Sequence, residues 1–241
     1  MELKPIRTDG QPVSPGYNYD AAHEAASPAQ GQKVLRNTYL LLAVTMVPTI
    51  IGAFIGMATA SVITASPMIS TIVMLVAVIG LQYGIAANRN SGVGVALLLL
   101  MTGLLGWWLG PILNFVLSMR NGMQLVGYAA AGTGIIFFAM GAIATTTKRD
   151  FSFMGKFLFV GMIALLVAML ANMFLQIPAL ALTISTLVIV VFSLFLLYDL
   201  NRIVRGGETN YVIATTSVYM SLFNIFANLL TLLGILGGER D

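Results

Sequence analysis

The chain alternates between long apolar runs and short polar breaks. An α-helix needs roughly 20 apolar residues to cross a hydrocarbon layer about 30 Å thick. Seven runs approach or exceed this length, at residues 39–60, 68–87, 93–117, 123–146, 157–176, 179–198 and 206–236. Pro178 separates the fifth run from the sixth. The pattern therefore predicts an all-α protein that spans a membrane with seven helices.

The last run differs from the others because polar residues recur within it at steps of four, three, four and three. These residues are Ser217, Ser221, Asn224, Asn228 and Thr231. This spacing places all five side chains on one face of a helix. An amide in lipid costs several kcal/mol when it has no partner. We therefore expect this helix to lie at the centre, wrapped by the other six, with its polar face toward other helices or a wet cavity.

Composition supports a membrane protein and restricts the chemistry that it can carry. Hydrophobic residues make up 58% of the chain and charged residues only 9%, whereas soluble domains carry about 25% charged residues. Cysteine is absent, and the single histidine is His23 in the polar N-terminal segment. We therefore expect no disulfide, no metal and no cofactor. The net charge of +3 fits membrane topology better than nucleic-acid binding.

Residues 1–32 are rich in Pro, Gly, Ala, Ser and Gln and show no apolar periodicity. Such a composition predicts a disordered tail. It lacks the apolar core of a signal peptide. We assign residues 33–241 to one seven-helix domain. The tail is either a solvated extension without function or a handle for a partner.

Basic residues in the polar breaks predict the orientation. One side of the membrane carries only Arg120 and Arg240, and the side of the N-terminus carries Lys33, Arg36, Arg89, Lys148, Arg149, Lys156, Arg202 and Arg205. Lys and Arg are enriched in cytoplasmic loops. The N-terminus is therefore expected in the cytoplasm and the C-terminus on the opposite side.

Pairs of glycines four residues apart predict close helix contacts, because small residues let helix backbones approach each other in a membrane. Three such pairs lie within the apolar runs, at Gly52 and Gly56, Gly80 and Gly84, and Gly106 and Gly110.

Asp199 is the only acid that directly continues an apolar run. Arg202 follows it by three residues, so the two side chains can pair on one helix face. The alternative is a proton-titrating group at the cytoplasmic mouth of the bundle. In the next loop we expect Glu208 to favour the start of the last helix, with Thr209 or Asn210 as its cap.

Several enzyme classes lack the residues that they need. A serine hydrolase needs a base beside its nucleophile, and no apolar run contains a histidine. An aspartyl mechanism needs two carboxylates that share a proton, and Asp199 has no second intramembrane acid, since Glu208 lies in the loop that precedes the last helix. No phosphate loop, metal cluster or dinucleotide fingerprint occurs. We expect a protein that is not an enzyme.

The segment LYDLNRIVRGGETNYVIATTSVYMSLFNIFANLLTLLG resembles the C-terminal signature of the Bax inhibitor/YccA family of membrane proteins. Further matches are KVLRNTY at 33–39, LGPILN at 109–114, DFSFMGKFLF at 150–159 and ANMFLQIPALALTIS at 171–185. The signature includes the loop residues Gly206, Gly207, Glu208, Thr209, Asn210 and Tyr211. The resemblance implies a seven-helix fold in which the other six helices wrap the last.

The resemblance is closest to the YccA-like branch, whose type is a bacterial inner-membrane protein that is a substrate and modulator of the FtsH protease. It implies that this chain lies in the inner membrane and acts by binding an FtsH-type ATP-dependent protease through its cytosolic tail.

Family members of the calcium-leak type imply an alternative function. Their LYD acid pairs with a second Asp on the last helix, and the pair senses pH and gates a Ca²⁺ pore. Asp199 matches the first position, but the second falls at Ser221. A lone carboxylate cannot share a proton across a dyad, which weakens this function. A passage for Ca²⁺ or protons past Asp199, Arg202, Ser221, Asn224 and Asn228 stays open.

Overall fold

The computed structural model describes residues 28–147 and 149–237, which form nine α-helices and contain no strand. The helices are α1 (Pro28–Ala58), α2 (Ala60–Thr64), α3 (Pro67–Ala87), α4 (Gly92–Trp108), α5 (Gly110–Leu117), α6 (Gly122–Thr146), α7 (Met154–Leu175), α8 (Pro178–Val204) and α9 (Tyr211–Leu236). Seven spans are long and apolar enough to cross a membrane, with α4 and α5 together forming the third. The predicted all-α fold with seven spans is confirmed.

Helix α1 begins before the apolar run that predicted it. It starts at Pro28, so residues 28–32, which the sequence placed in the tail, are helical. The extension lies against the end of α8, where a Cβ on Gly31 would come within 3.0 Å of Val204 O. Tertiary contact thus continues the helix where apolar periodicity is absent. The rest of the tail, residues 1–27, lies outside the described residues.

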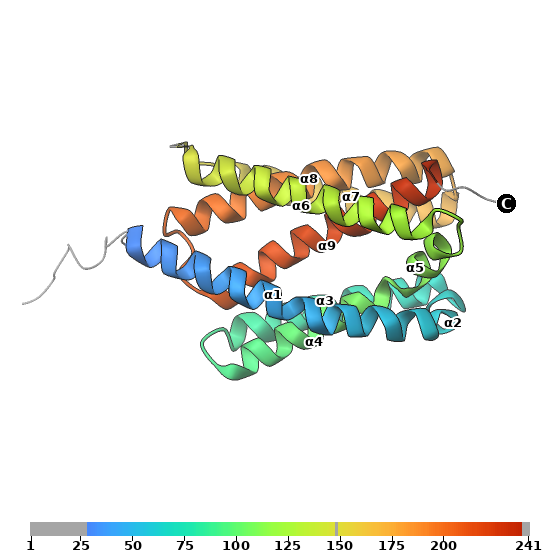
Figure 1. Cartoon of the computed structure of the whole chain (residues 1–241), viewed down its shortest axis with the longest axis horizontal. Helices are drawn as coiled ribbons and strands as arrows, with labels where there is room; N and C mark the ends of the chain where they lie inside the picture. Colours follow the sequence, from blue (N-terminus) through green and yellow to red (C-terminus); the bar gives the residue numbers. More distant parts are fainter. Residues whose placement is uncertain (1–27, 148, 238–241) are drawn as a thin grey trace, which may run out of the picture.

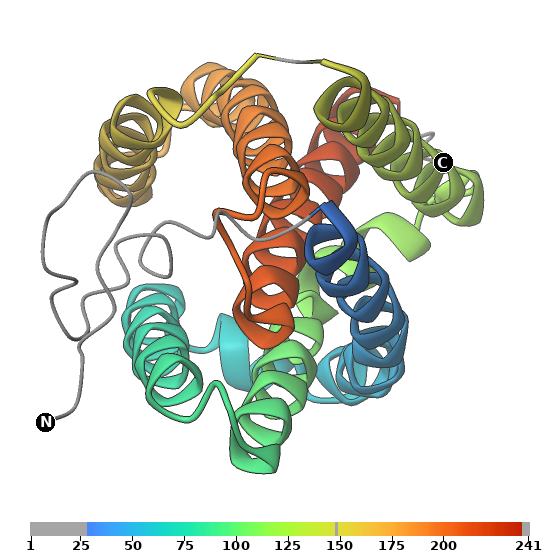
Figure 2. The ribbon, with the colours of Figure 1, turned by 90° about the vertical axis from the view of Figure 1, so that its left-hand side faces the viewer.

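The long helices form two layers with α9 running diagonally between them (Figures 1 and 2). In one layer α4 packs between α1 and α3, and in the other α8 packs between α6 and α7. Helix α9 packs on both layers, and between Val212 and Gly234 none of its residues is exposed. One detail differs from the predicted wrapping by six helices. Helix α7 packs on α8 and shares no extended contact with α9.

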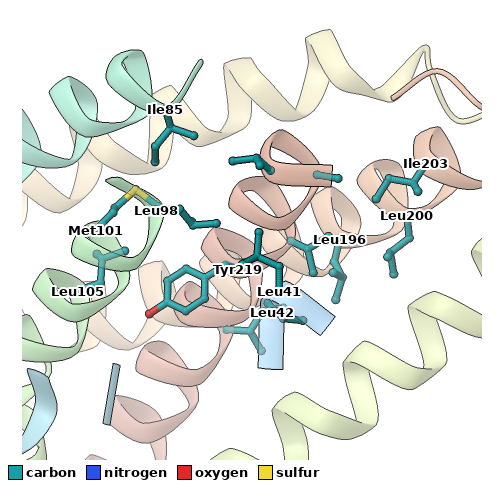
Figure 3. Packing of buried hydrophobic residues seen from close by; sticks show 14 of the residues in the cluster. Leu41, Leu42, Ile85, Leu98, Met101, Leu105, Leu196, Leu200, Ile203 and Tyr219 are labelled. Carbon is teal, nitrogen blue, oxygen red and sulfur yellow. The ribbon is translucent and has the colours of Figure 1, made fainter. Parts of the chain in front are cut away.

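Buried side chains of five helices meet around α9 (Figure 3). They include Leu41, Leu42, Ile85, Leu98, Met101, Leu196, Leu200, Ile203 and Tyr219. The hydroxyl of Tyr219 lies 2.8 Å from Thr49 Oγ1 and 3.3 Å from Thr102 O. One buried side chain of α9 is thus tied to both α1 and α4. Between helices in lipid, close packing and such hydrogen bonds stabilise association.

Two of the three predicted glycine pairs lie at one helix contact. A Cβ added at Gly52 would overlap Gly103 O, and one at Gly106 would overlap Thr49 O. The backbones of α1 and α4 therefore touch, as the spacing predicted. The third pair was wrongly predicted. Nothing lies within 4 Å of a Cβ at Gly80, and at Gly84 such an atom meets only the side chain of Leu97.

Candidate functional site

Hydrogen bonds and an ion pair fix the conformation of the signature loop, residues 206–211, between α8 and α9. Gly206 has a φ of 75°, a left-handed conformation that glycine adopts without strain. The N–H of Gly207 donates to Arg202 O at 2.8 Å and closes the last turn of α8. The side chain of Arg202 returns across this turn. Its Nη2 lies 3.2 Å from Glu208 Oε2, and its Nε donates to Gly207 O at 3.1 Å.

The expected ion pair between Asp199 and Arg202 is therefore replaced by one between Glu208 and Arg202. Within the described residues, the ion pair of Arg202 is made with Glu208 in the loop. Glu208 also accepts a hydrogen bond from the N–H of Asn210 at 2.9 Å. The acid expected to favour the start of α9 thus also fixes the end of α8.

Asn210 caps α9 and joins it to the opposite layer. Its Oδ1 accepts hydrogen bonds from the N–H groups of Val212 and Ile213 at 3.0 and 3.1 Å. Its Nδ2 donates to Arg89 O and to Asn90 Oδ1, in the turn between α3 and α4. Of the two predicted caps, the structure selects Asn210 over Thr209. Tyr211, the last residue of the signature loop, begins α9 and is exposed.

Asp199 lies in α8, five residues before its end. Its side chain is partly buried, and Leu196 and Leu200 near it on the same helix are buried. In the described part of the chain, no hydrogen bond or ion pair reaches its carboxyl group, and Arg202 and Glu208 are the charged groups that act on it. An acid inside a membrane-spanning segment is a candidate functional residue.

The structure separates the polar residues of α9 into two environments. Ser221 is buried in the packed bundle with a 2% exposed fraction. Asn224, Asn228 and Thr231 instead line a cavity of about 570 Å³. The cavity is bounded by α3, α4, α7 and α9, and α2 and α5 contribute to one end. The structure therefore does not gather Asp199, Ser221 and the two asparagines around one cavity.

The hydrogen bonds of the cavity residues stay within α9. Asn224 Nδ2 donates to Met220 O, Asn228 Nδ2 donates to Asn224 O, and Thr231 Oγ1 donates to Ala227 O, each at 2.8 Å. No hydrogen bond from the described residues reaches either asparagine Oδ1. Sequence spacing predicted that this stripe faces other helices or a cavity, but not where the cavity lies, which depends on how far apart α3 and α7 lie. In the described ranges no cluster of His, Asp and Glu could hold a metal ion.

Seven membrane-spanning helices, one of them the polar central helix α9, define a polytopic helical membrane protein. Residues 31–238 match the family described as "Inhibitor of apoptosis-promoting Bax1". The chain belongs to this family, which confirms the resemblance seen in its motifs.

Relatives of this chain include bacterial membrane proteins. "Modulator of FtsH protease YccA" of Escherichia coli K12 is 41% identical over 221 residues, which cover 92% of this chain and 97% of that protein. "Inner membrane protein YccA" of E. coli O6:H1 matches to the same extent. An "Uncharacterized membrane protein" of Vibrio cholerae is 43% identical over 207 residues, which cover 86% of this chain and 91% of the relative.

Proposed function

We propose that this chain modulates an FtsH-type protease in a bacterial inner membrane. The observation that carries the proposal is the 41% identity to the E. coli modulator over 97% of that protein's length. The family match over residues 31–238 includes every membrane span and the signature loop. The chain acts by binding and not by catalysis.

The tail is the proposed handle. FtsH-type proteases are ATP-driven and pull substrates in by a loose cytosolic end. Residues 1–27 are polar and carry no apolar periodicity, which suits such a grip. Pulling on them would load α1 first. Helix α1 is held against α8 at Gly31 and against α4 at Gly52 and Gly56. A body that resists extraction keeps the protease engaged and slows its turnover on other substrates.

The test uses the purified protease co-reconstituted with the full chain or with a chain that lacks residues 1–27. Degradation of a fluorescent membrane substrate is measured in both. The full chain should slow degradation several-fold, and the shortened chain should not. A matched control carries the same 27 residues in scrambled order, which keeps length and charge. If the shortened chain slows the protease as strongly as the full chain does, the handle mechanism is wrong.

A cation leak is the second candidate function. The observation that favours it is Asp199, an acid in a membrane-spanning helix that no described hydrogen bond reaches. Liposomes loaded with a calcium dye should then show Ca²⁺ entry that depends on pH. The variant Asp199→Asn should abolish the pH dependence while folding is retained. Entry at the level of empty liposomes, or entry unchanged in the variant, removes this candidate.

A further inference from the structure

The two layers of the bundle are joined differently at their two edges. At the edge of α1 and α6, Tyr39 and Phe137 make an edge-to-face contact with ring centroids 5.6 Å apart. At the opposite edge α3 and α7 share no extended contact, and Figure 2 shows them in different layers on the same side of α9. The 570 Å³ cavity lies at this second edge. We call it the α3–α7 groove.

The surroundings of the groove are hydrocarbon. Most of its walls belong to membrane-spanning segments: residues 67–78 of α3, Leu105 and Trp108 of α4, Met169 and Met173 of α7, and residues 220–231 of α9, while α2 and α5 close one end. Met169 is 39% exposed at its rim. Where these spans lie within the hydrocarbon layer, the opening faces lipid. Polar atoms inside it therefore need a partner that comes from the membrane.

Apart from the indole N–H of Trp108, the polar side-chain atoms of the groove that are left for a partner are acceptors without charge. Thr64, Thr71 and Thr231 each donate their hydroxyl proton to a carbonyl of their own helix. The Nδ2 groups of Asn224 and Asn228 also donate to α9, and their Oδ1 atoms receive no hydrogen bond from the described chain. No charged side chain of the described residues lines the groove. Its complement is an uncharged hydrogen-bond donor.

The spacing of these acceptors fits another helix. Asn224, Asn228 and Thr231 stand at positions i, i+4 and i+7 of α9, and the small Ala227 lies among them. At 1.5 Å per residue the stripe is about 10 Å long, or two turns. Small residues beside polar ones are typical of helix contacts in membranes.

Methionines make the apolar walls of the groove adaptable. Met74, Met169, Met173 and Met220 come from three different helices. Flexible thioether side chains can repack against partners of varied shape. A lipid acyl chain would fill the same space, but it has no donor and would leave both asparagine oxygens unpaired.

We propose that the α3–α7 groove binds a membrane-spanning helix of a partner protein. That helix presents serine or threonine hydroxyls one turn apart, which donate to Oδ1 of Asn224 and Asn228. This site deepens the proposed function. It rests on that function only for the identity of the partner, which would be a membrane helix of the protease. Binding of the helix itself is separable from any effect on proteolysis.

The test uses two synthetic helices in lipid vesicles. Both are Leu/Ala peptides of about 20 residues, the length of one span. One carries Ser at positions i, i+4 and i+7, and the other carries Ala there. The chain has no cysteine, so Ile69→Cys at the exposed face of α3 gives a unique dye site. Energy transfer to labelled peptide then reports association.

The serine peptide should associate about tenfold more tightly than the alanine peptide, as expected for two hydrogen bonds between membrane helices. The double variant Asn224→Leu with Asn228→Leu should remove this preference. Ala227→Phe, which blocks the groove and keeps both acceptors, should weaken association of both peptides. Thr183→Val is the matched control, because Thr183 is an exposed threonine of α8 that bonds only its own helix. Thermal unfolding verifies that each variant is folded.

Equal association of the two peptides, or a serine preference that survives the double variant, overturns the proposal. The proposal is also overturned if neither peptide is preferred and native mass spectrometry finds a phospholipid that is bound to the wild type and lost from Ala227→Phe. The vesicles hold no protease, so this test can contradict helix binding at the groove without contradicting modulation of the protease. If the double variant still slows the protease fully, the groove is not its docking site, although modulation stands.

Discussion

Arg202 pairs with Glu208 across the turn that joins α8 to α9, with 3.2 Å between Nη2 and Oε2, and not with Asp199 on its own helix. The pairing closes the signature loop and leaves Asp199 without a described ion pair. Two acids nine residues apart in the sequence, Asp199 and Glu208, thus have different roles. Glu208 stabilises the fold locally, and Asp199 is the candidate for chemistry inside the membrane.

The asparagine cap gives the sharpest test of the loop. Asn210→Ala removes the acceptor for two N–H groups of α9 and the donor to the α3–α4 turn. We expect a loss of about 1–2 kcal/mol in the free energy of unfolding. Asn210→Asp keeps the acceptor and loses the donor, so it should recover part of this loss. Unfolding in detergent, followed by circular dichroism, measures both. Equal stability of Asn210→Ala and the wild type would show that the loop does not hold the helices together.

The glycines of α1 and α4 should tolerate no side chain. Gly52→Ala and Gly106→Ala place a Cβ onto a backbone oxygen of the facing helix, so the helices must separate. We expect a sharp loss of folded protein in each case, read as a lower unfolding temperature and early aggregation on size exclusion.

Gly80→Ala is the matched control for these variants. A Cβ there meets nothing within 4 Å, and alanine favours a helix by about 1 kcal/mol over glycine. The variant should be as stable as the wild type or slightly more stable. If Gly52→Ala, Gly106→Ala and Gly80→Ala have the same stability, close backbone contact does not hold α1 and α4 together.

The hydroxyl of Tyr219 should contribute to stability. Tyr219→Phe keeps the ring in the core and removes the contacts with Thr49 and Thr102. Hydrogen bonds between membrane helices contribute about 0.6 kcal/mol on average, and we expect a loss of about this size. Tyr83→Phe is the control, because Tyr83 is 76% exposed. The difference between the two variants isolates the buried hydroxyl.

Orientation can be measured directly because the chain has no cysteine. Ser91→Cys lies in the turn between α3 and α4, and Ser118→Cys lies in the exposed turn between α5 and α6. A maleimide that cannot cross membranes should label Ser118→Cys in intact spheroplasts. It should label Ser91→Cys only after permeabilisation. The reverse pattern would place the N-terminus outside the cytoplasm and remove the tail from reach of a cytosolic protease.

Local features were predictable because their causes are local. Each apolar run must match the thickness of a bilayer, so length and composition alone predicted seven spans. A cap needs only its own backbone neighbours, and the sequence therefore narrowed the choice to Thr209 and Asn210. The start of α1 was missed because the packing of Gly31 on α8 replaces the apolar periodicity that marks a span.

The amino-acid sequence by itself determined the class of protein, the number of spans and the polar face of the last helix. Only the tertiary structure decided what each part of that face meets. Because α9 crosses diagonally between two layers, Ser221 is buried in packed helices and Asn228 lines an open groove. The tertiary structure also determines that Arg202 pairs with Glu208 and that the space beside Gly80 is open. Such outcomes depend on the positions of other helices, which no local pattern specifies.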